Sequence, residues 1–255
     1  MKLSVVIITF NEEKNIFRCI NSLYRVADEI IVVDSYSTDD TVRIARFLGA
    51  KVILHPFTDF VTQKNFATNQ ASNDWILSID ADEVLSDELK LSIQILKTLS
   101  ESGCYYCKRR TNYCGKWMSY GGWYPDKKIR LFDRTTGKWS AQKIDAQWKP
   151  YNAHTNIGEL NGDIMHYAYN TRTNYLRKVE QDSSRRAEIN FTMNKQVSIY
   201  QLFLSPVFYF IVTYVFRLGF LDGARGYQTG KMLALESYLT CRKTRAFFRK
   251  SNRQN

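Results

Sequence analysis

Short apolar runs alternate with amphipathic segments along the first 100 residues. Runs rich in β-branched and other apolar side chains cover residues 3–9, 29–33, 51–54 and 74–79. Such continuous runs are typical of strands that are buried on both faces. The intervening segments place apolar residues at helical spacing, which predicts helices after residues 11–13 and 37–40, over 61–72, and from 86 to about 99. This alternation predicts an α/β domain with a mostly parallel central sheet covered on both faces.

The remainder of the chain changes character twice. Residues 103–170 are rich in Tyr, Trp, Gly and Lys and contain short strand-like pieces at 128–132 and 163–167. We expect them to complete the same domain in a partly antiparallel way. Aromatic rings here either stack on sugars or fill the core, and we expect the core for most of them. Residues 171–255 are predicted to be helical, which gives two expected domains, 1–170 and 171–255.

An apolar run at residues 202–216 leaves three interpretations open. It forms a buried core or dimer helix, an interfacial membrane helix, or a spanning helix. The run is shorter than the roughly 20 residues that a spanning helix needs. Its many aromatic residues and the basic residues downstream favour the interfacial helix.

The net charge of +11 is unevenly distributed along the 255 residues. Residues 1–100 carry 10 Lys and Arg against 14 Asp and Glu, whereas residues 101–255 carry 26 against 11. The second part is therefore expected to meet an anionic partner: a membrane surface, a phosphorylated acceptor or a nucleic acid. No nucleic-acid-binding motif is recognisable, so we expect no nucleic-acid partner. Five cysteines without a regular framework fit a reducing cytoplasm, and no secretory signal is recognisable.

Polar clusters follow three of the predicted strands, at residues 9–12, 34–37 and 80–83. The carboxyl ends of parallel strands lie at one edge of a sheet, so these clusters should meet in one crevice. In the last cluster, Asp80 and Asp82 are separated by a single residue and repel one another. A divalent cation holding a diphosphate would relieve that repulsion, since Mg²⁺ and Mn²⁺ prefer hard oxygen ligands. A surface loop that caps a helix is the alternative for the tripeptide alone.

Four segments together resemble the family 2 glycosyltransferases, in particular the lipopolysaccharide core glucosyltransferase branch. They are Ser4-Val-Val-Ile-Ile-Thr-Phe-Asn-Glu12, Ile31-Val-Val-Asp34-Ser35, Gln63-Lys64-Asn65 and Ser78-Ile-Asp-Ala-Asp-Glu83. The likeness continues more loosely at 121–132, 162–166 and 219–223. The resemblance implies a GT-A-type fold and an inverting, metal-dependent transfer. It implies a hexose, glucose from UDP-glucose, as the transferred group and a lipid-linked or lipopolysaccharide-core glycan as the acceptor. The place of action would be the cytoplasmic face of the inner membrane, where the protein binds peripherally.

The resemblance also implies a nucleotide-binding set of residues. These are Thr9, Asn11, Glu12, Asp34, Ser35, Lys64 and Asp80. Asp34 would accept a hydrogen bond from the base, and a helix-entry cap is its alternative role. Lys64 would face the nucleotide or its phosphates, unless it is an ordinary solvated helix lysine.

The metal and the catalytic base are implied in the same way. Asp82 would be the principal ligand of Mg²⁺ or Mn²⁺, with Asp80 on the ribose or the metal. His166 would be a second ligand, although a lone histidine is more often structural.

For the base, the family pattern has a histidine before an acidic residue, whereas this chain has Ile144-Asp145. Asp145 is the first candidate for the base, with Asp126 and Glu159 as alternatives. The departure at Ile144 keeps open a second hypothesis, a nucleotide-sugar-binding or membrane-scaffold protein with impaired catalysis.

Overall fold

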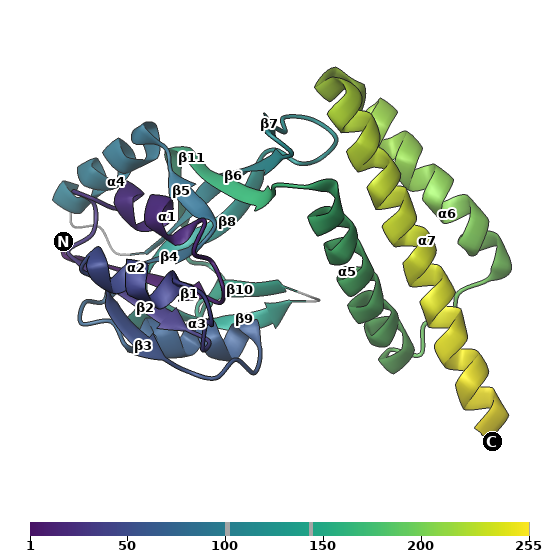
Figure 1. Ribbon diagram of the computed structural model, residues 1–255, viewed down its shortest axis with the longest axis horizontal. Helices are drawn as coiled ribbons and strands as arrows, with labels where there is room; N and C mark the ends of the chain where they lie inside the picture. Colours follow the sequence, from purple (N-terminus) through teal and green to yellow (C-terminus); the bar gives the residue numbers. More distant parts are fainter. Residues whose placement is uncertain (100–102, 143–144, 255) are drawn as a thin grey trace. The chain divides into compact units, whose positions relative to one another are not determined.

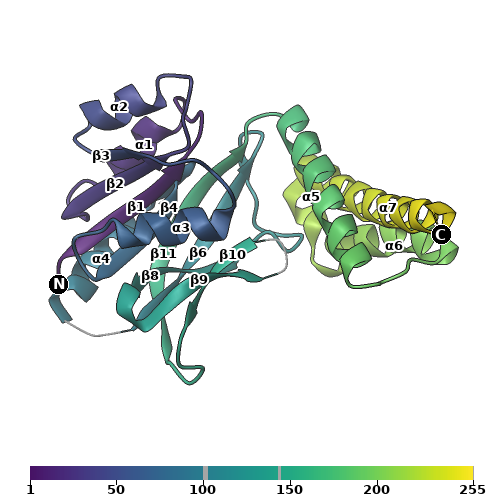
Figure 2. The same ribbon diagram turned by 90° about the horizontal axis from the view of Figure 1, so that it is seen from below.

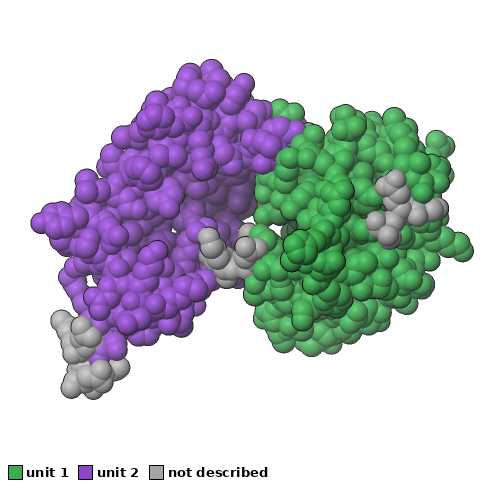
Figure 3. Space-filling model, turned by 180° about the vertical axis from the view of Figure 1, so that it is seen from behind, with its two compact units in different colours: residues 1–110, 126–167 green, residues 111–125, 168–255 purple. Residues whose placement is uncertain are grey.

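A computed structural model describes residues 1–99, 103–142 and 145–254 of the chain. The described residues form two compact units, which Figure 3 shows in different colours. Unit 1 comprises residues 1–110 and 126–167, and unit 2 comprises residues 111–125 and 168–255. The chain thus passes into unit 2 close to the expected boundary at residue 170, and a short earlier segment joins it there. The division into domains 1–170 and 171–255 stays a prediction.

Unit 1 is built on a mixed sheet whose N-terminal strands are parallel. The order along the sheet is β3-β2-β1-β4-β8-β6-β11-β5. The parallel strands are β1 (Leu3–Thr9), β2 (Glu29–Asp34), β3 (Lys51–Leu54) and β4 (Trp75–Asp80). All four coincide with the predicted apolar runs to within a residue. The α/β prediction is therefore confirmed, and the order places β1 between β2 and β4.

Helices cover the parallel strands on both faces (Figures 1 and 2). They are α1 (Ile16–Ser22), α2 (Thr41–Phe47), α3 (Phe60–Asn69) and α4 (Asp87–Leu99). Alternate residues of β1 belong to different cores: Val5 packs with residues of α1 and α4, whereas Val6 packs with residues of α3. This alternation explains why β1 is apolar throughout.

Antiparallel strands complete the sheet and carry the aromatic part of the core. The main ones are β5 (Glu83–Leu85), β6 (Cys104–Tyr113), β8 (Asp126–Asp133) and β11 (Ile157–Tyr169), with β7 (Lys116–Trp117) beside β6. The turn η1 (Arg134–Thr136) leads into a hairpin of β9 (Gly137–Gln142) and β10 (Asp145–Pro150). In this hairpin Trp139 and Trp148 are buried, and Trp148 stacks on Phe132 with 3.7 Å between ring centroids. These rings serve the core, as expected.

Unit 2 is dominated by helices. They are α5 (Arg172–Thr192), α6 (Ile199–Ile211), the π-helical turn η2 (Val212–Phe216), the short η3 (Gly219–Asp222) and α7 (Gly223–Gln254). A capping box begins α6, because Ser198 and Gln201 each bond the other's backbone N–H. The predicted helical segment after residue 170 is thus confirmed. The buried Asp222 carboxylate accepts the backbone N–H groups of Ser119 and Tyr120, which joins η3 to residues 116–120 of the same unit.

Candidate active site

The three predicted polar clusters converge at the carboxyl edge of the parallel strands. Thr9 is paired in register with Asp34 on β2, and Ile8 is paired with Asp80 on β4. The loops that follow these strands therefore begin side by side at one edge of the sheet. This is the edge at which ligands bind in open α/β sheets.

The loop after β1 is tied to the loop after β2 by reciprocal hydrogen bonds. Asn11 has a left-handed backbone (φ 53°), donates its N–H to Ser37 Oγ at 2.8 Å, and accepts the Thr38 N–H on Oδ1 at 2.8 Å. Ser35 donates its N–H to the Thr9 carbonyl and accepts Gln63 Nε2 on its hydroxyl at 3.1 Å. The two loops consequently form one pre-organised polar rim.

Asp34 lies fully buried beneath this rim. Its carboxylate accepts both the N–H (2.8 Å) and the hydroxyl of Ser37. These contacts are those of the turn-capping alternative, and each carboxylate oxygen retains a second lone pair for another donor. A contact of Asp34 with a nucleobase stays a prediction.

Thr9 and Glu12 belong to the expected nucleotide set, and their side chains differ in hydrogen bonding and charge. The Thr9 hydroxyl is buried and finds no hydrogen-bond partner among the described residues. An orphaned buried hydroxyl is costly, which makes it a candidate contact for a ligand. Burial raises the pKa of Glu12, and the hydrogen bond from Asn15 Nδ2 opposes that rise.

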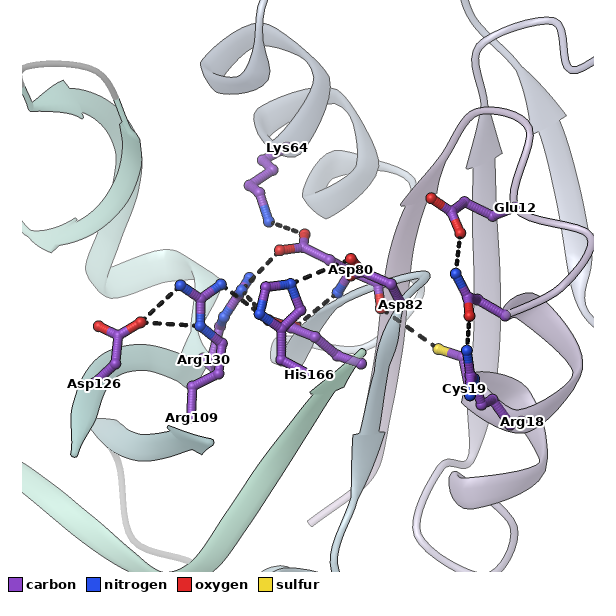
Figure 4. A network of polar contacts seen from close by, with 12 residues as sticks. Glu12, Arg18, Cys19, Lys64, Asp80, Asp82, Arg109, Asp126, Arg130 and His166 are labelled. Carbon is purple, nitrogen blue, oxygen red and sulfur yellow. Dashed lines mark hydrogen bonds and ion pairs between the residues drawn. The ribbon is translucent and has the colours of Figure 1, made fainter. Parts of the chain in front are cut away.

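Asp80 is clamped between two cations. Its Oδ1 contacts Lys64 Nζ at 2.6 Å and its Oδ2 contacts Arg130 Nη2 at 2.8 Å (Figure 4). Burial alone would raise the pKa of Asp80, but Arg130 and Lys64 hold it well below its ordinary value. Lys64 itself is buried over the Trp139 ring, so it is not a solvated surface lysine. Burial lowers the pKa of Lys64 despite the opposing charge of Asp80.

Arg130 and Glu83 extend this ion network, and the sequence assigned neither of them a role. Arg130 Nη2 contacts Glu83 Oε1 at 2.8 Å, and Glu83 Oε2 accepts the Asp80 backbone N–H at 2.9 Å. Arg109 contacts Glu83 at 3.4 Å. It also contacts Asp126 at 2.6 Å (Figure 4). A charged side chain within the buried end of a strand, Ile129-Arg130-Leu131, was the available signal. The network holds both ends of the turn from β4 into β5, because it contacts Asp80 and Glu83.

Asp82 and His166 face one another beside this network. Their Oδ2 and Nε2 atoms are 3.2 Å apart, and the Tyr167 N–H donates to the Asp82 carbonyl at 2.8 Å. The contact arises because β5 pairs with β11 and places His166 opposite Glu83. Burial would raise the pKa of Asp82, yet the facing His166 lowers it.

The chemistry of this pair fits Mg²⁺ or Mn²⁺. The Asp82 carboxylate oxygen and the His166 ring nitrogen lie 3.2 Å apart, so both groups could contact one such cation. The Asp82 carboxylate is the hard oxygen ligand that both cations prefer. The part of the chain that the structure describes contains no cluster of three or more His, Cys, Asp or Glu groups able to hold a metal. Other ligands would therefore come from diphosphate oxygens and water, as is usual for Mg²⁺.

The candidates for the catalytic base separate into two kinds. Asp145 begins β10, but its side chain and the whole of Ile144 lie outside the described residues. Asp126 and Glu159 are both held by cations, Asp126 by Arg109 and Glu159 by Lys127 at 2.6 Å. Burial would raise the pKa of Asp126, but Arg109 and Lys128 outweigh it, so this pKa is lowered. The hydrogen bond from Lys127 lowers the pKa of Glu159. A lowered pKa makes either carboxylate a weaker base.

Comparisons with known proteins agree with the class that this fold and site define. The chain matches the Glycosyl transferase family 2 over residues 4–162. It is 35% identical to an uncharacterized glycosyltransferase of Rickettsia typhi, covering 98% of this chain and 89% of that protein. It is 29% identical to the lipopolysaccharide core biosynthesis glycosyltransferase LpsC of Rhizobium meliloti, covering 95% of this chain and 92% of that protein.

A solved structure with a similar fold is the mannosyltransferase PcManGT from Pyrobaculum calidifontis, in complex with GDP-Man and Mn²⁺. Its TM-score is 0.55 at 13% identity, covering 95% of this chain and 86% of that one. The chain therefore belongs to glycosyl transferase family 2, and it is a glycosyltransferase with a GT-A-like α/β fold.

Proposed function

We propose that this glycosyltransferase transfers a hexose from a UDP-sugar, with inversion, to a lipopolysaccharide-core or other lipid-linked glycan. The observation that carries the proposal is the Asp82–His166 pair at the carboxyl edge of β4, beside Asp34 and the polar rim formed by the loops after β1 and β2. Glucose is the hexose expected from the sequence resemblance. The similarity to LpsC supports the acceptor class.

The donor would bind along the edge formed by the loops after β1, β2 and β4. Asp34 and the Thr9 hydroxyl would meet the nucleoside, since one is a buried acceptor with spare lone pairs and the other a buried hydroxyl without a partner among the described residues. Asp80 is held by Lys64 and Arg130, so it would act on the ribose or in the outer coordination shell. Asp82 is then the principal ligand and His166 the second.

The chain's residues would divide the chemical work between donor and acceptor sides. The acceptor hydroxyl attacks the anomeric carbon, the bond from that carbon to the diphosphate oxygen breaks, and a carboxylate takes the hydroxyl proton. Asp145 is the proposed carboxylate. Asp82 and His166 would hold Mg²⁺ or Mn²⁺, which supplies positive charge against the charge that develops on the departing diphosphate.

We further infer that the acceptor is met at the cytoplasmic face of the inner membrane. The exposed apolar helix of unit 2 and its basic surroundings support a peripheral location. The same features fit an acceptor that is itself anchored in lipid.

The test is UDP release from UDP-glucose by the full chain, with Mn²⁺ or Mg²⁺ and extracted lipid-linked glycans as acceptors. We expect Asp82→Asn to lose at least about 100-fold in rate, because a metal ligand is replaced by a neutral amide. The matched control is Asp87→Asn, whose carboxylate is 97% exposed on α4 and should leave the rate unchanged. Equal rates for Asp82→Asn and the wild type would refute the assignment of Asp82 to the metal.

A further inference from the structure

Helix α6 and the turn η2 expose a continuous apolar face. Together they form one helix, Ile199–Phe216, that is long and apolar enough to cross a membrane, and only 6% of this segment is buried. The exposed side chains recur at helical spacing and are each 42% to 75% exposed: Tyr200, Phe203, Leu204, Val207, Phe208 and Ile211. We call these six residues the α6 face. An apolar surface of this kind marks a binding site.

The opposite side of α6 packs against α7, which runs beside it in both ribbon views (Figures 1 and 2). The Ser205 and Ser237 hydroxyls are 2.8 Å apart, and the rings of Tyr214 and Tyr227 contact one another with centroids 5.8 Å apart. The contacts of α6 with its own unit therefore leave the α6 face available to a partner.

A crossing of the bilayer by α6 conflicts with its neighbour. Ser205 contacts Ser237 and Tyr214 contacts Tyr227, so the α7 segment between residues 227 and 237 runs alongside α6. That segment carries Lys231 and Glu236, and Glu236 is paired with Arg186 of α5 at 2.9 Å. A spanning α6 would draw these charges into hydrocarbon, where they are costly. An orientation of α6 parallel to the membrane surface leaves them in water.

The charge of unit 2 favours a membrane over a second copy of the chain as the partner of the α6 face. Unit 2 contains 16 Lys and Arg against 5 Asp and Glu, whereas unit 1 contains 20 of each, so the whole net charge of +11 resides in unit 2. Lys195 and Arg217 flank an uncharged stretch that contains the entire α6 face. Self-association would bring two strongly basic units together, whereas an anionic lipid surface complements them.

We propose that the α6 face binds in the plane of an anionic phospholipid bilayer, with its aromatic and aliphatic side chains at the boundary between headgroups and acyl chains. Membrane binding by the α6 face deepens the proposed function, and it rests on that function because the proposed acceptor is lipid-linked. The α6 face and its orientation depend on residues of unit 2 alone.

The test is co-sedimentation of the full chain with vesicles of phosphatidylethanolamine and phosphatidylglycerol. The wild type should bind these vesicles, bind phosphatidylcholine vesicles more weakly, and lose part of its binding at high salt. Phe203→Ser/Phe208→Ser should weaken the partition constant at least about tenfold, since two aromatic side chains no longer enter the interface. The matched control is Phe17→Ser/Phe47→Ser in unit 1, where the side chains are 52% and 86% exposed, and it should bind like the wild type.

Several outcomes would overturn the proposal. Equal binding of the two double variants would remove the α6 face from the membrane contact. A wild-type dimer in solution that becomes monomeric in Phe203→Ser/Phe208→Ser, without vesicle binding, would assign the face to a second copy. Retention of the full chain in cell membranes after alkaline carbonate extraction would indicate a spanning helix.

Failure of this proposal can be told apart from failure of the proposed function. The double variant on α6 should keep the wild-type rate of UDP release with a soluble acceptor fragment, and Asp82→Asn should keep wild-type vesicle binding. Loss of UDP release in the α6 variant would contradict a separate membrane role. Loss of vesicle binding in Asp82→Asn would do the same.

Discussion

Replacement of Arg130 by methionine tests whether the buried ion network fixes the turn between β4 and β5. Methionine keeps most of the length of the side chain and removes its charge. Arg130 Nη2 lies 2.8 Å from both Asp80 Oδ2 and Glu83 Oε1, and the Glu83 side chain has no exposed surface. The substitution therefore leaves a buried carboxylate short of its main cation.

The cost follows from which partners remain. Removal of one member of a buried ion pair typically costs about 3–5 kcal/mol. Asp80 keeps Lys64 at 2.6 Å, and Glu83 keeps the Asp80 N–H and a longer contact with Arg109 at 3.4 Å. We therefore expect the lower end, about 3 kcal/mol in the free energy of unfolding. The turn also carries Asp82, so a weaker apparent affinity for Mn²⁺ in UDP release should accompany the loss.

Urea denaturation of the wild type and four variants (Arg130→Met, Glu83→Gln, the two combined, and a control) provides the measurement. The control Arg43→Met removes an exposed pair with Asp40 and should cost less than about 1 kcal/mol. In the Arg130→Met background, Glu83→Gln removes a buried charge that has lost its main cation. Glu83→Gln should therefore cost far less in that background than in the wild type. A free energy for Arg130→Met within about 1 kcal/mol of the wild type, or strictly additive single changes, would refute the reasoning.

Two further predictions concern other parts of unit 1. Trp148→Ala should lower the free energy of unfolding by about 3–5 kcal/mol, because Trp148 is buried and stacks on Phe132, and a loss under about 1 kcal/mol would contradict that packing. The pKa of Asp126 is lower in the folded chain, since Arg109 and Lys128 outweigh burial. The ionised Asp126 side chain therefore contributes fully to the free energy of unfolding above the unfolded-state pKa of about 3.9. This contribution is lost as the pH falls through the pKa of Asp126 in the folded chain. The difference in unfolding free energy between the wild type and Asp126→Asn should narrow below about pH 4, and a difference independent of pH would contradict the assigned shift.

The parallel half of the sheet was predictable because its signal is local. The strands β1, β2, β3 and β4 are short apolar runs bounded by polar residues, and each was predicted to within a residue. The parallel arrangement in turn predicts that their carboxyl ends coincide. The convergence of Thr9, Asp34 and Asp80 at one edge followed from this topology without any knowledge of side-chain contacts.

The ion network was not predictable, because its partners are distant in sequence. Arg130 and Glu83 are 47 residues apart and meet only when β8 pairs with β4 in its register. His166 was singled out by the resemblance, but its place opposite Glu83 depends on the three-residue strand β5, which has no periodic signal of its own. Lys64 pairs with the carboxylate of Asp80, a contact that the sequence did not predict, and its expected role toward a nucleotide stays a prediction.

The cysteines show how strand geometry can be read from spacing. Cys104 and Cys107 are three apart on β6, where such positions point to opposite faces. Both are buried, and they belong to different hydrophobic cores on the two sides of the sheet. Burial raises the pKa of the Cys107 thiol to about 12, as suits a structural residue without reactivity.

The most direct test of the account is a crystal structure of the full chain with UDP and Mn²⁺, with the metal located by its anomalous scattering. We expect one manganese peak within about 2.3 Å of both an Asp82 carboxylate oxygen and a His166 ring nitrogen, with UDP phosphate oxygens completing the shell. The uracil should lie against Asp34 and the loops that follow β1 and β2. A manganese peak away from Asp82 and His166, or UDP bound away from the carboxyl edge of β1, β2 and β4, would contradict the central claim.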